Sequence, residues 1–293
     1  MADKFPAMLS QKFNIKKIKD AWPVAVEPKL DGIRCLIVLK HIDDEYEIVT
    51  YSRAGNVFNS IEAIEDVIMD TFAETSWTED MVFDGEVFCG DFSTTVSQIK
   101  RKSEQAKDAV LTIFDIVPLQ EWADGRSALD FTDRRTMLAQ FFDGKSPIEK
   151  RIQMSKAVLA GCIDEINELH TIAVDLGHEG VMVKPLNGEI SHWVAKRSYG
   201  WMKLKTRHDI DLPILRAEEG EGRLKKTLGA IIVDFEGVEV NVGSGFTDEQ
   251  RAELWRLNNK GQLAGLTAEV NYLCVTADKS LREPTFSTIR IDK

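Results

Sequence analysis

The apolar residues of this chain fall in short β-rich runs that polar turns separate. Residues 24–26 and 33–39 are two such runs, and Lys29-Leu30-Asp31-Gly32 lies between them. Runs rich in Val and Ile are typical of strands, whereas Asp and Gly favour turns. The segment therefore predicts a strand, a tight turn and a second strand, with Lys29 at the rim of a sheet and Gly32 allowing close approach to a ligand.

The remainder of the chain up to Lys205 mixes further strands with helices. Apolar residues at helical spacing predict one helix from Ser60 through Phe72, one capped by Thr132 and one capped by Ser155. Strands are predicted at residues 46–51, 81–89, 109–117, 180–183 and 202–204. This mixture predicts an α+β fold with antiparallel or mixed sheets.

After Lys205 the pattern changes to short strands that a single helix interrupts. Thr247 and Gln250 form the signature of a capping box at the start of a helix over residues 247–257. The last predicted strand, 268–275, leads into a charged tail. We therefore predict a boundary within residues 206–209, a first domain over 1–206, and a second domain over 207–293 that suits a small β-barrel of the OB type.

Composition excludes several classes of protein. No run of 18 apolar residues occurs and the N-terminus has no continuous apolar segment, so we expect neither a membrane span nor a secretory leader. The four cysteines are scattered without a CxxC pair, which favours free thiols in a reducing cytoplasm over a zinc site. The net charge of −11 is unusual for a nucleic-acid enzyme, so contact with phosphates depends on local basic clusters, each of which is also compatible with a solvated surface.

Charged residues recur at the predicted strands. Lys203 and Lys205 alternate on one strand and so lie on the same face. Charges buried in a sheet are costly unless a ligand or partner neutralises them, so together these segments indicate one cleft for a polyanion and a metal. The segments are Glu27 to Arg34, Ser52-Arg53-Ala54-Gly55, Asp84-Gly85-Glu86, Phe114-Asp115, Glu179 to Lys184, and Trp201 to Lys205.

In this order, the segments resemble the motifs of the covalent nucleotidyltransferases, and specifically of the ATP-dependent DNA ligases. Lys29, Asp31, Gly32 and Arg34 match the lysine motif of that family, which capping enzymes share in similar form. The end of the chain, Arg290-Ile291-Asp292-Lys293, is similar to the last motif of the DNA ligases. The resemblance implies an adenylation domain followed by an OB-fold domain. Only 28 residues precede Lys29, so we expect a minimal ligase of the bacteriophage, viral or small bacterial kind.

The resemblance also implies a role for each matching residue. Lys29 carries AMP, with Asp31 beside it in the catalytic motif and Lys203 and Lys205 as clamps on the α-phosphate. Glu179 holds the metal, and Glu86 contacts the ribose or a water of the metal. The nucleotide is further bound by Glu27 and Phe114 at adenine, Arg34 and Arg53 near the ribose phosphate and the 5′-phosphate of the nick, Lys184, and Arg290 and Lys293 at pyrophosphate.

The expected reaction seals nicks in duplex DNA with ATP and Mg²⁺ or Mn²⁺, in replication, repair and recombination. We expect a monomer in the cytoplasm of a bacterium or a phage-infected host, with a hinge near residues 206–209 that lets the second domain move between steps. An RNA ligase or an RNA-capping guanylyltransferase uses the same covalent chemistry and remains an alternative. A third possibility is a nucleotide- or DNA-binding module without a nucleophile, against which Lys29, Glu179, Lys203 and Lys205 together argue.

Overall fold

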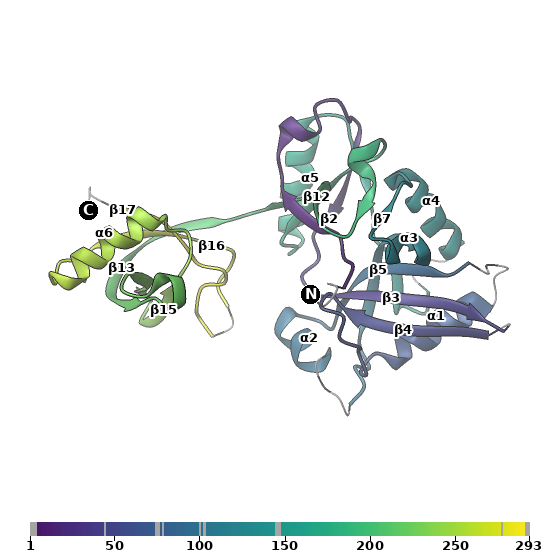
Figure 1. Ribbon diagram of the computed structural model, residues 1–293, viewed down its shortest axis with the longest axis horizontal. Helices are drawn as coiled ribbons and strands as arrows, with labels where there is room; N and C mark the ends of the chain where they lie inside the picture. The colour runs from purple at the N-terminus through teal and green to yellow at the C-terminus, as the bar shows by residue number, and fades with distance from the viewer. Residues whose placement is uncertain are drawn as a thin grey trace. The chain divides into compact units, whose positions relative to one another are not determined.

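The chain divides into two compact units, Met1–Leu204 and Lys205–Lys293. The computed structural model describes residues 5–43, 45–73, 77, 79–99, 101, 104–143, 148–276 and 278–290, and the statements below concern these residues. Figure 1 labels the elements along the chain. None of the described helices is long and apolar enough to cross a membrane.

One sheet of the first unit is mainly antiparallel, with strand order β4-β3-β5-β6-β8. Figure 1 shows β3, β4 and β5 side by side. Helices α1 and α4 pack apolar side chains, among them Phe72 and Phe141, against one face of this sheet and form the largest core of the unit. The elements are β3 (Ile33–Ile42), β4 (Glu45–Ser52), β5 (Met81–Phe88), β6 (Val110–Pro118), β8 (Ile152–Met154), α1 (Glu62–Ala73) and α4 (Phe131–Phe142).

A second sheet has the order β1-β12-β10-β2-β9, with β1 parallel to β12 and β2 antiparallel to β10 and β9. Helix α5 buries Ile166 and Ala173 against it. The elements are β1 (Leu9–Lys12), β2 (Val24–Pro28), β9 (Val158–Ala160), β10 (Gly180–Pro185), β12 (Arg197–Lys205) and α5 (Ile163–Asp175). Shorter elements complete the unit: η1 (Ile15–Lys17), α2 (Phe92–Ile99), α3 (Leu119–Ala123), β7 (Arg126–Ser127), η2 (Glu189–Ser191) and β11 (Trp193–Val194).

The segment around Lys29 connects the two sheets. The expected strand, turn and strand are present, with β2 and β3 on either side of residues 29–32, and the two strands belong to different sheets. Gly32 is required by packing within the protein: an added Cβ would lie 2.3 Å from the carbonyl oxygen of Val87 and 2.9 Å from Cγ of Glu86. The close approach expected for a ligand is thus made by β5.

Two helix starts differ from the sequence prediction. Helix α4 begins at Phe131 with Asp130 as its N-cap, and the hydroxyl of Thr132 instead donates to the carbonyl oxygen of Leu186 at 3.2 Å. Ser155 caps no helix, because residues 158–160 pair with β2 and the helix starts only at Ile163. Pairing with a neighbouring strand is a long-range interaction that overrode the local helical pattern.

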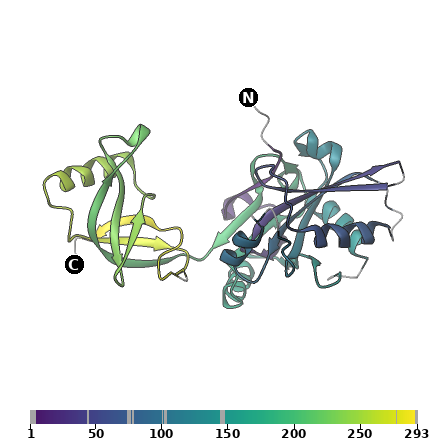
Figure 2. The same ribbon diagram turned by 90° about the horizontal axis from the view of Figure 1, so that it is seen from below.

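The second unit is built on a sheet with the order β15-β14-β13-β16-β17. Figure 2 shows α6 lying outside this curved sheet. The capping box expected at Thr247 and Gln250 is confirmed. The charged tail was not predicted as a strand, yet β17 pairs with β16 along its length. The elements are β13 (His208–Glu219), η3 (Gly222–Leu224), β14 (Leu228–Phe235), β15 (Val238–Val242), α6 (Asp248–Asn259), β16 (Thr267–Tyr272) and β17 (Thr285–Arg290).

Arg251 fastens α6 to this sheet. Its side chain is buried, and its guanidinium donates to the carbonyl oxygens of Leu228, Gly229 and Gly243, each at 2.8 Å. Its guanidinium carbon also lies 4.9 Å from the ring centre of Phe246. Because buried carbonyl groups need donors, one arginine satisfies backbone groups at three positions.

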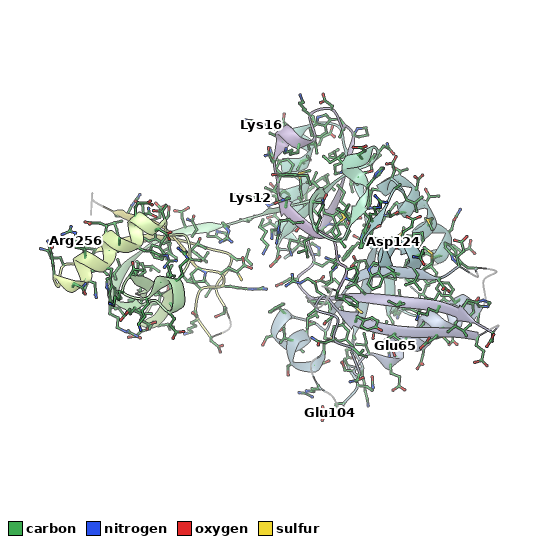
Figure 3. All side chains as sticks on the ribbon, viewed as in Figure 1. Lys12, Lys16, Glu65, Glu104, Asp124 and Arg256 are labelled. Atoms are coloured by element: carbon green, nitrogen blue, oxygen red, sulfur yellow. The ribbon has the colours of Figure 1, made fainter. Side chains whose placement is uncertain are left out.

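We predict that Arg251→Met lowers the stability of the second unit by about 3 kcal/mol, since hydrogen bonds to a charged group contribute about 1.5–3 kcal/mol each and water recovers part of the loss. Hydrogen exchange of β14 and β15 amides in the full chain measures the change. Arg256→Met is the matched control, because Arg256, labelled in Figure 3, lies on the same helix and is exposed, with its guanidinium paired to Glu253. Equal protection in the two variants would contradict the prediction.

Candidate nucleotide-transfer site

Lys29 and Glu179 form an ion pair where the two sheets connect. The backbone N–H of Lys29 donates to the carbonyl oxygen of Gly180 at 2.8 Å, which fixes Lys29 beside the start of β10. Its ammonium also donates to the carbonyl oxygen of Leu30 at 3.3 Å. The Lys29 side chain is 22% exposed and that of Glu179 is 7% exposed, so the lysine is the part of the pair that solvent reaches. Asp31 is half-buried in the same connection.

Glu86 is the second carboxylate near Lys29. It accepts a hydrogen bond from the backbone N–H of Gly32 at 3.2 Å. Burial raises the pKa of Glu86 to about 7, although the charges of Lys29 and Arg34 and the Gly32 hydrogen bond act in the opposite direction. The carboxyl is therefore divided between its two protonation states near neutral pH, in contact with the loop that carries Lys29.

Arg34 is held inside the protein. It binds the carboxylate of Asp84 with two nitrogens, Nε at 2.5 Å from Oδ1 and Nη2 on Oδ2, and Nη1 donates to the carbonyl oxygen of Met8 at 2.9 Å. Its guanidinium carbon lies 4.9 Å from the ring centre of Trp201 and 5.5 Å from that of Phe114. Burial raises the pKa of Asp84, and Arg34 opposes the rise. Arg34 is thus engaged by protein groups, whereas Arg53 is exposed after β4.

Glu27, Lys184 and Phe114 lie together at another part of the site. The Nζ of Lys184 is 2.6 Å from Oε2 of Glu27 and donates to the carbonyl oxygen of Phe114 at 3.2 Å. Glu27 and Lys184 are almost fully buried, and the ammonium lies about 5 Å from the rings of Phe114 and Trp201. The Phe114 ring remains half-buried and meets Trp201 edge to face at 5.5 Å. Lys184 therefore contacts both residues predicted to bind the base, Glu27 and Phe114, rather than solvent.

Sequence reasoning missed two arginines on α4. Arg134 is fully buried and binds Asp115 with Nε and Nη2, at 2.7 and 3.1 Å. Arg135 reaches Glu27, with Nη1 3.4 Å from Oε1. A signal was present, because Arg134 occupies a position of the helix's apolar stripe between Phe131 and Leu138, where a charge needs a buried partner.

The other predicted cations differ in their surroundings. Lys203 lies on β12, and its Cα is paired with that of Lys12 on β1. Within the second unit, Lys205 is 3.3 Å and Arg207 3.2 Å from the carboxylate of Glu283. Burial opposes ionisation of Glu283, but these cations lower its pKa.

Arg290 ends β17, with Nε 3.3 Å from Asp211 and Nη1 3.1 Å from Glu269. Arg290 is therefore anchored in the sheet of the second unit. Lys293, the other residue predicted at pyrophosphate, lies outside the described residues.

The raised pKa of Glu86 predicts a pH-dependent effect of Glu86→Gln on stability. Glutamine keeps the acceptor for Gly32 but cannot ionise. In the wild type, stability is greatest below the unfolded-state pKa of about 4.3 and is lost as pH rises through about 7, because the fold disfavours the ionised carboxyl. The variant should gain on the order of 2–3 kcal/mol relative to wild type between pH 4.5 and 8. Urea unfolding without nucleotide or metal measures this, and parallel pH curves would contradict it.

Comparisons with known proteins identify the family of the chain. The model of the ATP dependent DNA ligase domain matches residues 7–205, and that of the DNA ligase OB-like domain matches residues 219–290. A DNA ligase of Thermococcus fumicolans is 31% identical over 277 residues, which cover 85% of this chain and 46% of that protein. The chain thus spans about half the length of the curated relatives it matches, and these are archaeal, which gives no support to the expected bacterial or phage source.

Solved structures extend the comparison to the fold. The structure named Pmar-Lig_PreS3 is 31% identical with a TM-score of 0.86, covering 98% of this chain and 68% of its own. A Lig E DNA ligase, described as binding DNA with a minimal scaffold, is 19% identical with a TM-score of 0.71, covering 97% and 99%. The predicted class, an α+β adenylation domain with an OB-type domain, is confirmed. The chain belongs to the ATP-dependent DNA ligase family.

Proposed function

We propose that this protein seals nicks in duplex DNA with ATP, by way of AMP bound covalently to Lys29. The observation that carries the proposal is the pairing of Lys29 with Glu179 at the junction of two sheets, in a chain of this family. We assign residues 1–206 to nucleotide transfer and residues 207–293 to the OB-type domain that assists it. Nicked duplex DNA is the proposed partner, and the protein acts as a monomer.

The side chains around Lys29 fit a nucleoside triphosphate and a divalent cation. The half-buried Phe114 offers a stacking surface, and the carboxylate of Glu27, although held by Lys184 and Arg135, keeps lone pairs that can accept from an exocyclic amine. Lys29 and Lys203 supply positive charge for phosphates. Glu86 and Glu179 are oxygen ligands of the kind that Mg²⁺ and Mn²⁺ prefer.

Lys29 must lose a proton before its nitrogen can attack phosphorus. Glu179 holds the Lys29 nitrogen in an ion pair, so the nitrogen must leave that contact to reach the α-phosphorus, and its proton passes to solvent. Glu179 or Glu86 would hold a divalent cation, which would supply positive charge against the triphosphate. The Lys29 nitrogen then bonds to the α-phosphorus, the bond to the bridging oxygen breaks, and pyrophosphate leaves with the electron pair.

The later steps use the same site on DNA. An oxygen of the nick's 5′-phosphate bonds to the phosphorus of AMP as the P–N bond to Lys29 breaks, and the amine leaves. The 3′-hydroxyl then bonds to the 5′-phosphorus, its proton passes to solvent, and AMP leaves with the bridging oxygen. Arg53 is exposed and available to a DNA phosphate, whereas Arg34 must exchange part of its contact with Asp84 to reach one. We assign Lys203 and Lys205 to the α-phosphate, and Arg290 and Lys293 to pyrophosphate in the first step.

The first test is Lys29→Ala. Wild type incubated with ATP and Mg²⁺ should gain the mass of one AMP, and the variant should gain none, because alanine has no nucleophile. On a nick that already carries 5′-AMP, the variant should still join the ends, since that step does not use the lysine nitrogen. A stable adduct on Lys29→Ala would show that another residue is the nucleophile.

The second test separates the steps with Arg290→Gln and with a chain that ends at Ile289. Transfer of AMP to the protein should slow by about 10²-fold, since a cation on departing pyrophosphate acts electrostatically. Sealing of a 5′-adenylylated nick releases no pyrophosphate and should change much less. Arg216→Gln, which removes an exposed arginine of β13 that pairs with Glu239, is the control. Equal losses in both steps would point instead to damage of the β16–β17 pairing.

A further inference from the structure

Glu27 is an unusual carboxylate for its position. Its side chain is 2% exposed on β2, which has a neighbouring strand on either side, and burying a carboxylate is costly unless both oxygens have partners. Lys184 meets Oε2 at 2.6 Å and Arg135 meets Oε1 at 3.4 Å. Lys184 and Arg135 therefore contact different oxygens of Glu27, and together they fix the orientation of its carboxylate.

The two cations come from different parts of the fold. Lys184 lies on β10, the strand that pairs with β2 and so with Glu27 itself. Arg135 comes from α4, a helix that packs on the other sheet. Its Nη2 donates to the carbonyl oxygen of Ser155, a buried residue that follows β8. This hydrogen bond fixes the guanidinium between the Ser155 segment and Glu27.

Arg134, its neighbour in sequence, contacts a different strand. It binds Asp115 and also donates to the carbonyl oxygens of Leu129 and Ser191. Asp115 directly follows Phe114 on β6. Consecutive arginines of one helix thus fix the strand that carries Phe114 and the carboxylate of Glu27.

We propose that Arg135 is a positioning residue that aims Glu27 at the base and thereby sets the preference for adenine. The proposal rests on the nucleotide-transfer function above, in which Glu27 meets the base. A carboxylate held between two cations presents only acceptors. The 6-amino group of adenine donates a hydrogen bond, whereas hypoxanthine and guanine carry a carbonyl oxygen at that position and are repelled. Without Arg135, the carboxylate turns about its contact with Lys184 and the discrimination falls.

The test uses binding, so that it does not depend on turnover. The probes are an ATP analogue with a methylene bridge between the α- and β-phosphorus atoms and its hypoxanthine counterpart, which differs at position 6. Isothermal titration calorimetry with Mg²⁺ measures both dissociation constants. Wild type should prefer the adenine analogue, and Arg135→Met should reduce that preference about tenfold, the effect of roughly one hydrogen bond. Arg135→Lys should restore part of it, and Arg126→Met, which removes an exposed arginine of β7, should retain it.

A double-mutant cycle separates positioning from general damage. In a Glu27→Gln background, Arg135→Met should cause no further loss of preference. In self-adenylylation, Arg135→Met should raise KM for ATP more than it lowers kcat. Equal weakening of both analogues, or an unchanged preference, would overturn the proposal. If Arg135→Met does not fold, the ratio of the two dissociation constants is measured in Arg135→Gln and compared with that in Arg135→Lys. Failure of wild type to bind either analogue would overturn the nucleotide-transfer function as well.

Discussion

Glu27 and Lys184 form an ion pair in the interior of the first unit, where neither charge is exposed. Such a pair is not a strong source of stability, because desolvation of two charges offsets most of their attraction. Its effect is to fix the orientation of the Glu27 carboxylate. The ammonium also binds the carbonyl oxygen of Phe114, so β10, β2 and β6, which belong to two sheets, are joined at one nitrogen. The positions of Glu27 and Phe114, the residues proposed to bind adenine, therefore depend on the contacts of Lys184.

The same principle governs the other charges at the sheet junction. Lys29 is paired with Glu179, Arg34 with Asp84, and Arg134 with Asp115. Each pair fixes a side chain that would otherwise have many rotamers, which is the kind of preorganisation that phosphoryl transfer needs. In the proposed function, a triphosphate and a metal would exchange partners with these ion pairs. The net charge of −11 averages over the whole chain, whereas the proposed site depends on the cations that lie locally at the sheet junction.

The sequence was informative where local patterns decide the structure. Runs of apolar residues located β5, β6 and β16, and the capping box at Thr247 located α6. Long-range pairing between strands decided other elements. Residues 158–160 form an edge strand that pairs with β2, and residues 285–290, in the charged tail, form β17 because they pair with β16. The order of charged motifs indicated Lys29, Glu179 and Glu86, but Arg135 could not be assigned because its partner, Glu27, lies far from it in sequence and only the fold brings them together.

Mapping of the AMP adduct by tandem mass spectrometry tests the central claim most directly. After incubation of the wild-type chain with ATP and Mg²⁺, a single AMP should be found on the peptide that contains Lys29, and fragment ions should place it on the Lys29 nitrogen. An adduct on Lys203, Lys205 or any other residue, or no adduct under conditions where a nick is sealed, would contradict the account.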